Sequence, residues 1–193
     1  MLSNEDNADA INNWKAVIWK RLWSLELPFK IFIFLRKLCT NCLPMRKELR
    51  RRIAFISPLC PFCHTKEESL EHLFLHCPMT RAIWFGTDLT LRVEEIRTTS
   101  IKYWIRDWLA NHALTQQDAL WFYGQLVCTL WCTWLYRNEV IFNGQSANPT
   151  KVLMHQKSLL HWIGRAIKEK KHYQNCQRQL SSIQASPNPY KFL

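Results

Sequence analysis

The sequence is short of the residues that mark disordered and all-β chains. Only four glycines occur in 193 residues, and 48% of the residues are hydrophobic, so the chain has the material for a packed core. Strand-like alternation of apolar and polar residues is scarce. Acidic residues are also few, 15 against 26 lysines and arginines, which leaves a net charge of +11. These shortages predict a mainly α fold and an anionic partner, of which nucleic acid is the commonest.

The N-terminal stretch, MLSNEDNADA, lacks the features of a secretory signal and of a transit peptide. We therefore expect an intracellular chain whose eight cysteines stay reduced, which favours metal binding over disulfides. The longest uncharged run, 119–136, is close to the minimum length of a membrane span. Gly124, Gln125, Thr129 and Thr133 interrupt this run, so we interpret it as a buried helix and expect no membrane contact.

Helical spacing of apolar residues recurs before and after the middle of the chain. It predicts an amphipathic helix at 14–25, which Pro28 should end, and a short helix around 104–109. Residues 29–42 also read as a helix, with Cys39 and Cys42 on its apolar face, although 29–34 alternates like a strand. After a linker at 143–149, an isolated basic amphipathic helix is expected at 152–172.

The densest group of metal-binding residue types is CPFCHTKEESLEHLFLHC, residues 60–77. Its spacing, C-x2-C-x8-H-x4-C, provides Cys60, Cys63, His72 and Cys77 from one local segment. Thiolate and imidazole are the ligands that Zn²⁺ prefers, and four of them complete a tetrahedron. We therefore predict one structural zinc per chain, with no coordination position left for water or substrate.

Other ligand sets remain open on the sequence alone. His76 shares a helical face with His72 but adjoins Cys77, and His64 directly follows Cys63, so both are expected to be bystanders. A four-cysteine ribbon would instead use the two pairs Cys39/Cys42 and Cys60/Cys63, with seventeen residues between the pairs. In the third alternative there is no metal and the cysteines are buried thiols, as we expect for Cys128 and Cys132 within the apolar run.

A basic run directly precedes the cysteine–histidine segment. Its candidate phosphate-binding residues are Arg46, Lys47, Arg50, Arg51 and Arg52. Phe62, inside the metal loop, is the candidate for stacking on an unpaired base of RNA or single-stranded DNA. The run has two other interpretations: it could neutralise a zinc site of net charge −1, or act as a nuclear signal, so the compartment stays open.

The order of these motifs carries a family resemblance. The motifs are a tryptophan-rich opening that ends at Leu27-Pro28-Phe29-Lys30, Leu43-Pro44 followed by Arg46, the cysteine–histidine set with Glu71-His72-Leu73-Phe74, Trp84, and the closing Trp131, Trp134, Arg137-Asn138 and Phe142. Over residues 14–144 the chain resembles the plant reverse-transcriptase zinc-binding domain, which lies in LINE-type retroelement proteins between polymerase and ribonuclease H domains. The resemblance assigns the metal to the same CCHC set and makes Cys42 a packing residue.

The resemblance implies a division of the chain into four segments. These are a polar tail at 1–12, a reverse-transcriptase zinc-binding domain at 13–86, a connector with a tryptophan-rich helical extension at 87–142, and a linker with the basic helix at 143–193. Most of the ten tryptophans are expected in the core.

The carboxylate clusters of the neighbouring enzyme domains are missing. Polymerases hold two metal ions with clustered carboxylates, but no two aspartates are adjacent here, and the only acidic residue after Glu139 is Glu169. We therefore expect a non-catalytic module that binds zinc and nucleic acid. The alternatives are a protein-interaction or scaffold module with exposed apolar surface, or a retroelement remnant without function.

Overall fold

The computed structural model describes residues 27–93, 96, 100–110 and 116–184. Within these ranges the regular elements are all helical, and only an isolated bridge between Leu59 and Glu67 has strand pairing. The elements are α2 (Phe29–Cys39), α3 (Arg46–Arg50), the π-helical turn η1 (His72–His76), α4 (Pro78–Gly86), α5 (Ile101–Ala110), α6 (Gln116–Asn143) and α7 (Pro149–Gln184). The predicted mainly α fold is confirmed. The helix expected at 14–25 lies outside the described residues.

Helix α2 resolves the conflict between helical and strand-like patterns at 29–42 in favour of the helix. It begins after Pro28, and its buried face consists of Ile31, Phe32, Phe34, Leu35 and Leu38. The helix ends at Cys39, and the left-handed backbone of Asn41 (φ 54°) then turns the chain away. Cys42 is exposed as a result. The prediction that Cys42 packs on the apolar face was therefore wrong, because the helix stops before reaching it.

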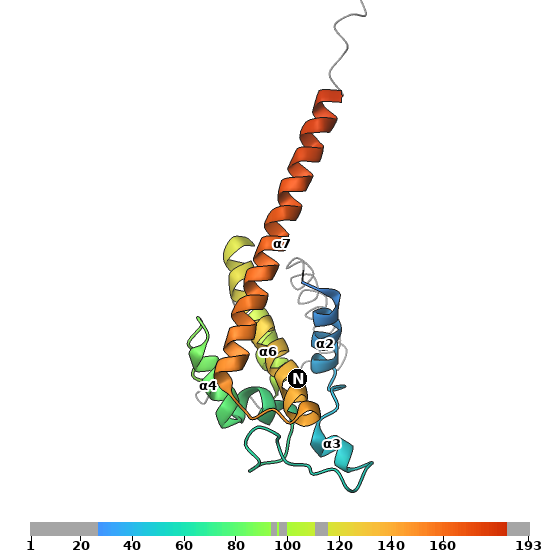
Figure 1. The fold of residues 1–193 in the computed structure, drawn as a ribbon, viewed down its shortest axis with the longest axis vertical. Helices are drawn as coiled ribbons and strands as arrows, with labels where there is room; N and C mark the ends of the chain where they lie inside the picture. Colours follow the sequence, from blue (N-terminus) through green and yellow to red (C-terminus); the bar gives the residue numbers. More distant parts are fainter. Residues whose placement is uncertain (1–26, 94–95, 97–99, 111–115, 185–193) are drawn as a thin grey trace, which may run out of the picture.

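Helices α6 and α7 lie side by side and form the long axis of the molecule (Figure 1). The middle of α6 is buried, including both of its cysteines, as expected for the uncharged run. The sequence predicted that helix α7 would be isolated, and that prediction was wrong. Helix α7 packs against α6 and α4, where Val152, Ile163 and Ile167 are buried. Its distal part extends beyond the other helices (Figure 1).

The expected basic face of α7 is exposed. Its members are Lys157, His161, Arg165, Lys168 and His172. In the described ranges, no helix combines the length and the apolar character needed to cross a membrane.

One hydrophobic cluster runs through the described segments, across the boundary expected at residue 86. Trp84 of α4 meets Trp104 of α5 edge to face, with ring centroids 5.3 Å apart. Phe34 of α2 meets Trp131 of α6 in the same way at 5.2 Å. All four aromatic residues are buried. The three tryptophans among them therefore pack in the core and do not form a ligand-binding surface. The short elements around the cysteines therefore pack on the same core as the long helices.

Candidate metal centre

Cys60 and Cys63 lie on a tight loop that the backbone closes twice. The amide of His64 donates to the carbonyl of Cys60 at 2.9 Å, and the amide of Cys60 donates to the carbonyl of Lys66 at 2.8 Å. His64 takes a left-handed conformation (φ 55°) and its side chain is exposed. The loop therefore turns both cysteines inward and leaves His64 outside the cluster.

The π-helical turn η1 brings His72 and Cys77 together. The amide of Cys77 donates to the carbonyl of His72, five residues earlier, at 2.7 Å. At the start of the turn, the Ser69 hydroxyl accepts a hydrogen bond from the amide of His72 at 3.1 Å. Cys77 is also the residue that precedes the first turn of α4, which begins at Pro78. A single turn thus carries the imidazole and ends in the third cysteine.

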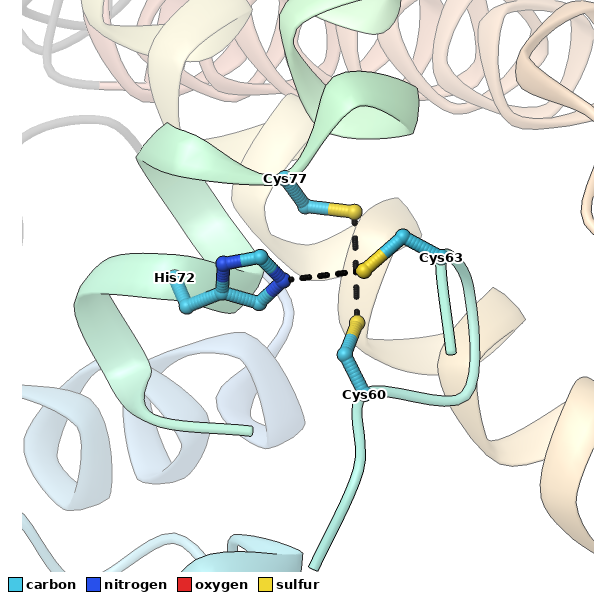
Figure 2. A group of neighbouring side chains, drawn as sticks. All are labelled: Cys60, Cys63, His72 and Cys77. Atoms are coloured by element: carbon cyan, nitrogen blue, oxygen red, sulfur yellow. Dashed lines mark hydrogen bonds between the residues drawn. The ribbon is translucent and has the colours of Figure 1, made fainter. Parts of the chain in front are cut away.

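The four side chains converge on one point (Figure 2), with ligand atoms all within 4.8 Å of one another. The sulfurs of Cys60 and Cys77 are 3.9 Å apart, and the sulfur of Cys63 lies 3.3 Å from Nε2 of His72. Zinc bonds of about 2.3 Å to sulfur and 2.0–2.1 Å to nitrogen require ligand separations of this order. The sulfur separation also excludes a disulfide, whose bond is about 2.05 Å. This CCHC group is able to hold one metal ion.

The protonation of the thiols differs across the cluster. The hydrogen bond that Cys60 donates to Cys77, together with burial, raises the pKa of Cys60 to about 12. The same hydrogen bond lowers the pKa of Cys77. A hydrogen bond from the backbone amide of Met79, at the start of α4, lowers it further. Burial opposes ionisation of Cys63, but hydrogen bonds, chiefly from Thr65, lower its pKa. The surroundings thus favour ionisation of Cys63 and Cys77 and oppose it at Cys60.

The rival ligand sets are not assembled. Among the described residues, the CCHC set is the group whose ligand atoms converge, and Cys39 and Cys42 are not part of it. Cys39 is a partly buried thiol at the end of α2, and burial raises its pKa to about 11. His76 lies outside the convergent group as well. The four-cysteine ribbon is therefore not the arrangement of this structure.

Helix α4 supports the π-helical turn by two hydrogen bonds to its carbonyls. The Thr80 hydroxyl donates to the carbonyl of Leu73 at 2.6 Å, and the Trp84 indole donates to the carbonyl of Phe74 at 2.7 Å. Thr80 and Trp84 are fully buried, so water cannot replace either bond. The turn that carries His72 is thus held by side chains from the next helix.

A buried ion pair that no sequence pattern indicated connects the metal segment to α6. The guanidinium of Arg137 donates to both carboxylate oxygens of Glu68, at 2.8 and 2.7 Å. Glu68 also accepts the amide of Arg46 at 2.7 Å, and Arg137 donates to the carbonyl of Pro44 at 3.1 Å. Glu68 is 0% and Arg137 3% exposed. Three segments distant in sequence are therefore joined at one carboxylate.

The basic run is only partly available to a ligand. Lys47 forms an ion pair with Glu67 at 3.0 Å, and Arg46 is half-buried and donates to the carbonyl of Leu59 at 3.3 Å. Arg50, Arg51 and Arg52 are exposed, although Arg50 also donates to the carbonyl of Ile56 at 3.2 Å and Arg51 forms an ion pair with Glu48 at 2.7 Å. Arg46 and Lys47 thus hold the loop in place, and the exposed charge is concentrated at 50–52.

Phe62 does not face solvent, which corrects its assignment as a base-stacking residue. Its side chain is 6% exposed, and its ring lies 6.3 Å from the ring of Tyr136 in α6. The loop that turns the cysteines inward also turns Phe62 into the core. Phe62 attaches the metal loop to α6 and offers no surface to a base.

Comparison with known families identifies the segment that contains these ligands. Residues 6–84 match the model of the family described as zinc-binding in reverse transcriptase. The match covers 79 of the 193 residues, less than half of the chain. The match includes all four convergent ligands and ends at Trp84, so it does not extend over the remainder of the 14–144 resemblance. Neither the curated proteins nor the solved structures contain a match to the chain.

Proposed function

We propose that the chain is a non-catalytic, zinc-stabilised module that binds RNA or single-stranded DNA, and that it derives from a LINE-type plant retroelement. The observation that carries the binding proposal is the exposed arginine run 50–52 directly before the metal loop. Residues 49–66 contain no acidic residue, although Arg51 forms an ion pair with Glu48 at 2.7 Å, so the positive charge of this surface is concentrated at Arg50 and Arg52. Arginine binds phosphate through paired donors, and such contacts supply most of the affinity of non-specific complexes.

Zinc has a structural role in this proposal. Cys60, Cys63, His72 and Cys77 would each supply one bond, which fills the tetrahedron and leaves no position for a reacting water. When bound, the metal would fix the cysteine loop and the π-helical turn to each other. It would thereby also hold the segment that connects the arginine run to Cys60. The proposal therefore includes no catalytic step.

A metal titration tests the ligand assignment. We expect one zinc per chain by elemental analysis, lost in Cys77→Ser and retained in Cys39→Ser. Retention of stoichiometric zinc in Cys77→Ser would contradict the CCHC assignment. Loss of zinc in Cys39→Ser would favour the ribbon instead.

Fluorescence anisotropy with a labelled 12-nucleotide single strand at low salt tests the binding. We expect binding that weakens as salt rises, because phosphate contacts release counterions. The double variant Arg51→Gln/Arg52→Gln should weaken binding and flatten the salt dependence by about 0.7 in log–log slope for each phosphate that is no longer neutralised. The charge-matched control is Arg36→Gln/Lys37→Gln, on the exposed face of α2. Absence of binding at low salt, or equal effects of the two pairs, would contradict the proposal.

A protein-interaction module is the second candidate, and exposed apolar side chains favour it. Phe29, Phe142, Trp162 and Tyr173 are each more than half exposed. Sedimentation over a range of concentrations distinguishes the two candidates. Self-association that is indifferent to added oligonucleotide would support an interaction surface over nucleic-acid binding.

A further inference from the structure

The most exposed large apolar side chain of the described residues follows the arginine run. Phe55 is 90% exposed, and it lies three residues after Arg52. An exposed phenylalanine ring gains free energy when a ligand covers it. The other phenylalanine near the run, Phe62, is buried in the core. Phe55 is thus the aromatic side chain of this surface that remains open to a ligand.

The backbone around Phe55 is held in a defined turn. The amide of Ile56 donates to the carbonyl of Ile53 at 3.1 Å, which places Phe55 in the second central position of a tight turn. The amide of Ile53 donates to the carbonyl of Leu49 at 2.9 Å and so attaches the turn to the end of α3. The aromatic ring is therefore presented from a fixed position at the tip of a loop.

A positive charge is held against the backbone of the turn that carries Phe55. The guanidinium of Arg50 donates to the carbonyl of Ile56, the residue that follows Phe55, at 3.2 Å. Arg51 and Arg52 are exposed at the start of the same loop. On the other side, the loop continues into the acid-free chain that leads to Cys60. An exposed ring on a loop that also carries cationic side chains matches the surfaces on which unpaired bases stack while their phosphates contact arginine.

We propose that Phe55 is a stacking site for an unpaired base of a single-stranded nucleic acid. The proposal rests on the nucleic-acid binding proposed above and assigns to Phe55 the role that the sequence suggested for Phe62. The charge of the loop favours this occupant over an apolar protein segment, because a polyanion neutralises Arg50 and Arg52 whereas an apolar segment would desolvate them. Recognition by stacking is tolerant of sequence, so every base should serve.

The test compares two labelled 12-nucleotide strands by anisotropy at low salt. One strand carries bases and the other carries abasic sites throughout, so both have the same phosphates. The zinc-loaded wild type should bind the base-bearing strand at least about five-fold more tightly, the effect of stacking one base. Phe55→Ala should abolish this preference and leave the affinity for the abasic strand unchanged.

Two further variants separate stacking from a simple apolar contact. Phe55→Trp should retain the preference for the base-bearing strand, because it keeps an aromatic face. Phe55→Leu should lose it, because it keeps only apolar area. The control is Phe85→Ala in α4, which removes another exposed phenylalanine (59%) from a helix well separated from α3 in Figure 1.

The outcomes distinguish this inference from the proposed function. Binding of both strands with no preference, or a preference that survives in Phe55→Ala or Phe55→Leu, overturns the stacking site and leaves the proposed function intact. If the wild type binds neither strand, the proposed function fails as well. If Phe85→Ala has the same effect as Phe55→Ala, Phe55 has no special role.

Discussion

Residues 43–86 and residues 116–184 are folded by different interactions. In the first region the helical elements have five to nine residues, well below the roughly 12–15 at which an isolated helix is even marginally stable. Besides the apolar core that they share with the long helices, they depend on convergent ligands, a buried ion pair and hydrogen bonds to buried carbonyls. In the second region two helices of 28 and 36 residues pack along each other through apolar side chains. Loss of metal should therefore damage the first region and spare the second.

Removing zinc is the change with the largest expected effect on this contrast. Structural zinc contributes about 10–16 kcal/mol of apparent binding free energy at pH 7. A chelator, or Cys77→Ser, should release amide protons of 59–77 to fast hydrogen exchange while those in the middle of α6 stay protected. Hydrogen exchange resolved by mass spectrometry measures both regions at once. Equal loss of protection in the two regions would show that they fold as one unit.

Proton release should accompany zinc binding. The pKa of Cys60 is raised to about 12 when no metal is present, so this thiol is protonated at neutral pH and must lose its proton to coordinate zinc. Zinc affinity should therefore rise with pH, by about tenfold per unit for each proton released. Calorimetry in two buffers of different ionisation enthalpy counts the protons. If zinc binding releases no protons, the prediction that Cys60 is protonated before binding is contradicted.

Breaking the ion pair between Glu68 and Arg137 is the next largest change. Arg137→Met leaves a buried carboxylate without its partner, which costs about 3–5 kcal/mol. Urea unfolding of the zinc-loaded protein measures the loss. Glu68→Gln in the same background should recover part of it, because glutamine carries no charge and still accepts the amide of Arg46. A loss below about 1 kcal/mol in the single variant would mean that the pair is open to solvent.

The hydrogen bond between Thr80 and the carbonyl of Leu73 predicts a smaller effect. Thr80→Val leaves that carbonyl buried without its partner, at a cost of about 1–3 kcal/mol by urea unfolding. Thr40→Val is the matched control, because the Thr40 hydroxyl donates to the carbonyl of Arg36 in an exposed position that water can fill. The control should change stability by less than about 0.5 kcal/mol. Equal effects would contradict the role given to burial.

The smallest change concerns the long helices. Gly164 lies within α7, and a Cβ added there meets no atom within 4 Å, so Gly164→Ala should stabilise the protein by about 0.5–1 kcal/mol. Gly144 has a left-handed backbone (φ 64°), and Gly144→Ala should instead destabilise it. Thermal unfolding followed at the helical circular-dichroism signal compares the two. If Gly164→Ala instead lowers the stability, the higher helix propensity of alanine does not determine the effect of this substitution.

The sequence predicted the ligand set because its geometry is local. All four residues fall within eighteen positions, and a tight loop and one helical turn suffice to bring them together. Helix α2 was also predictable, since its buried residues follow the helical period. The ligand roles themselves stay a prediction until metal is measured.

Contacts between distant segments could not be predicted in this way. Glu68 stands in a polar run, and nothing in that run indicates that its carboxylate is buried by an arginine 69 residues later. Phe62 was wrongly assigned to the surface for the same reason, since the ring that it meets belongs to α6. The end of α2 before Cys42 depended on the left-handed residue Asn41, which no periodicity reveals.

The guanidinium that neutralises Glu68 lies more than fifty positions beyond the end of the family match at residue 84. An excised fragment consisting of 6–84 alone would keep every zinc ligand but leave the buried carboxylate of Glu68 stranded without a counter-charge. Such a fragment should be less stable than the longer chain and prone to precipitate. The smallest self-sufficient unit around the metal therefore has to reach past Arg137, and any genetic rearrangement that separates the two segments would inherit the same defect.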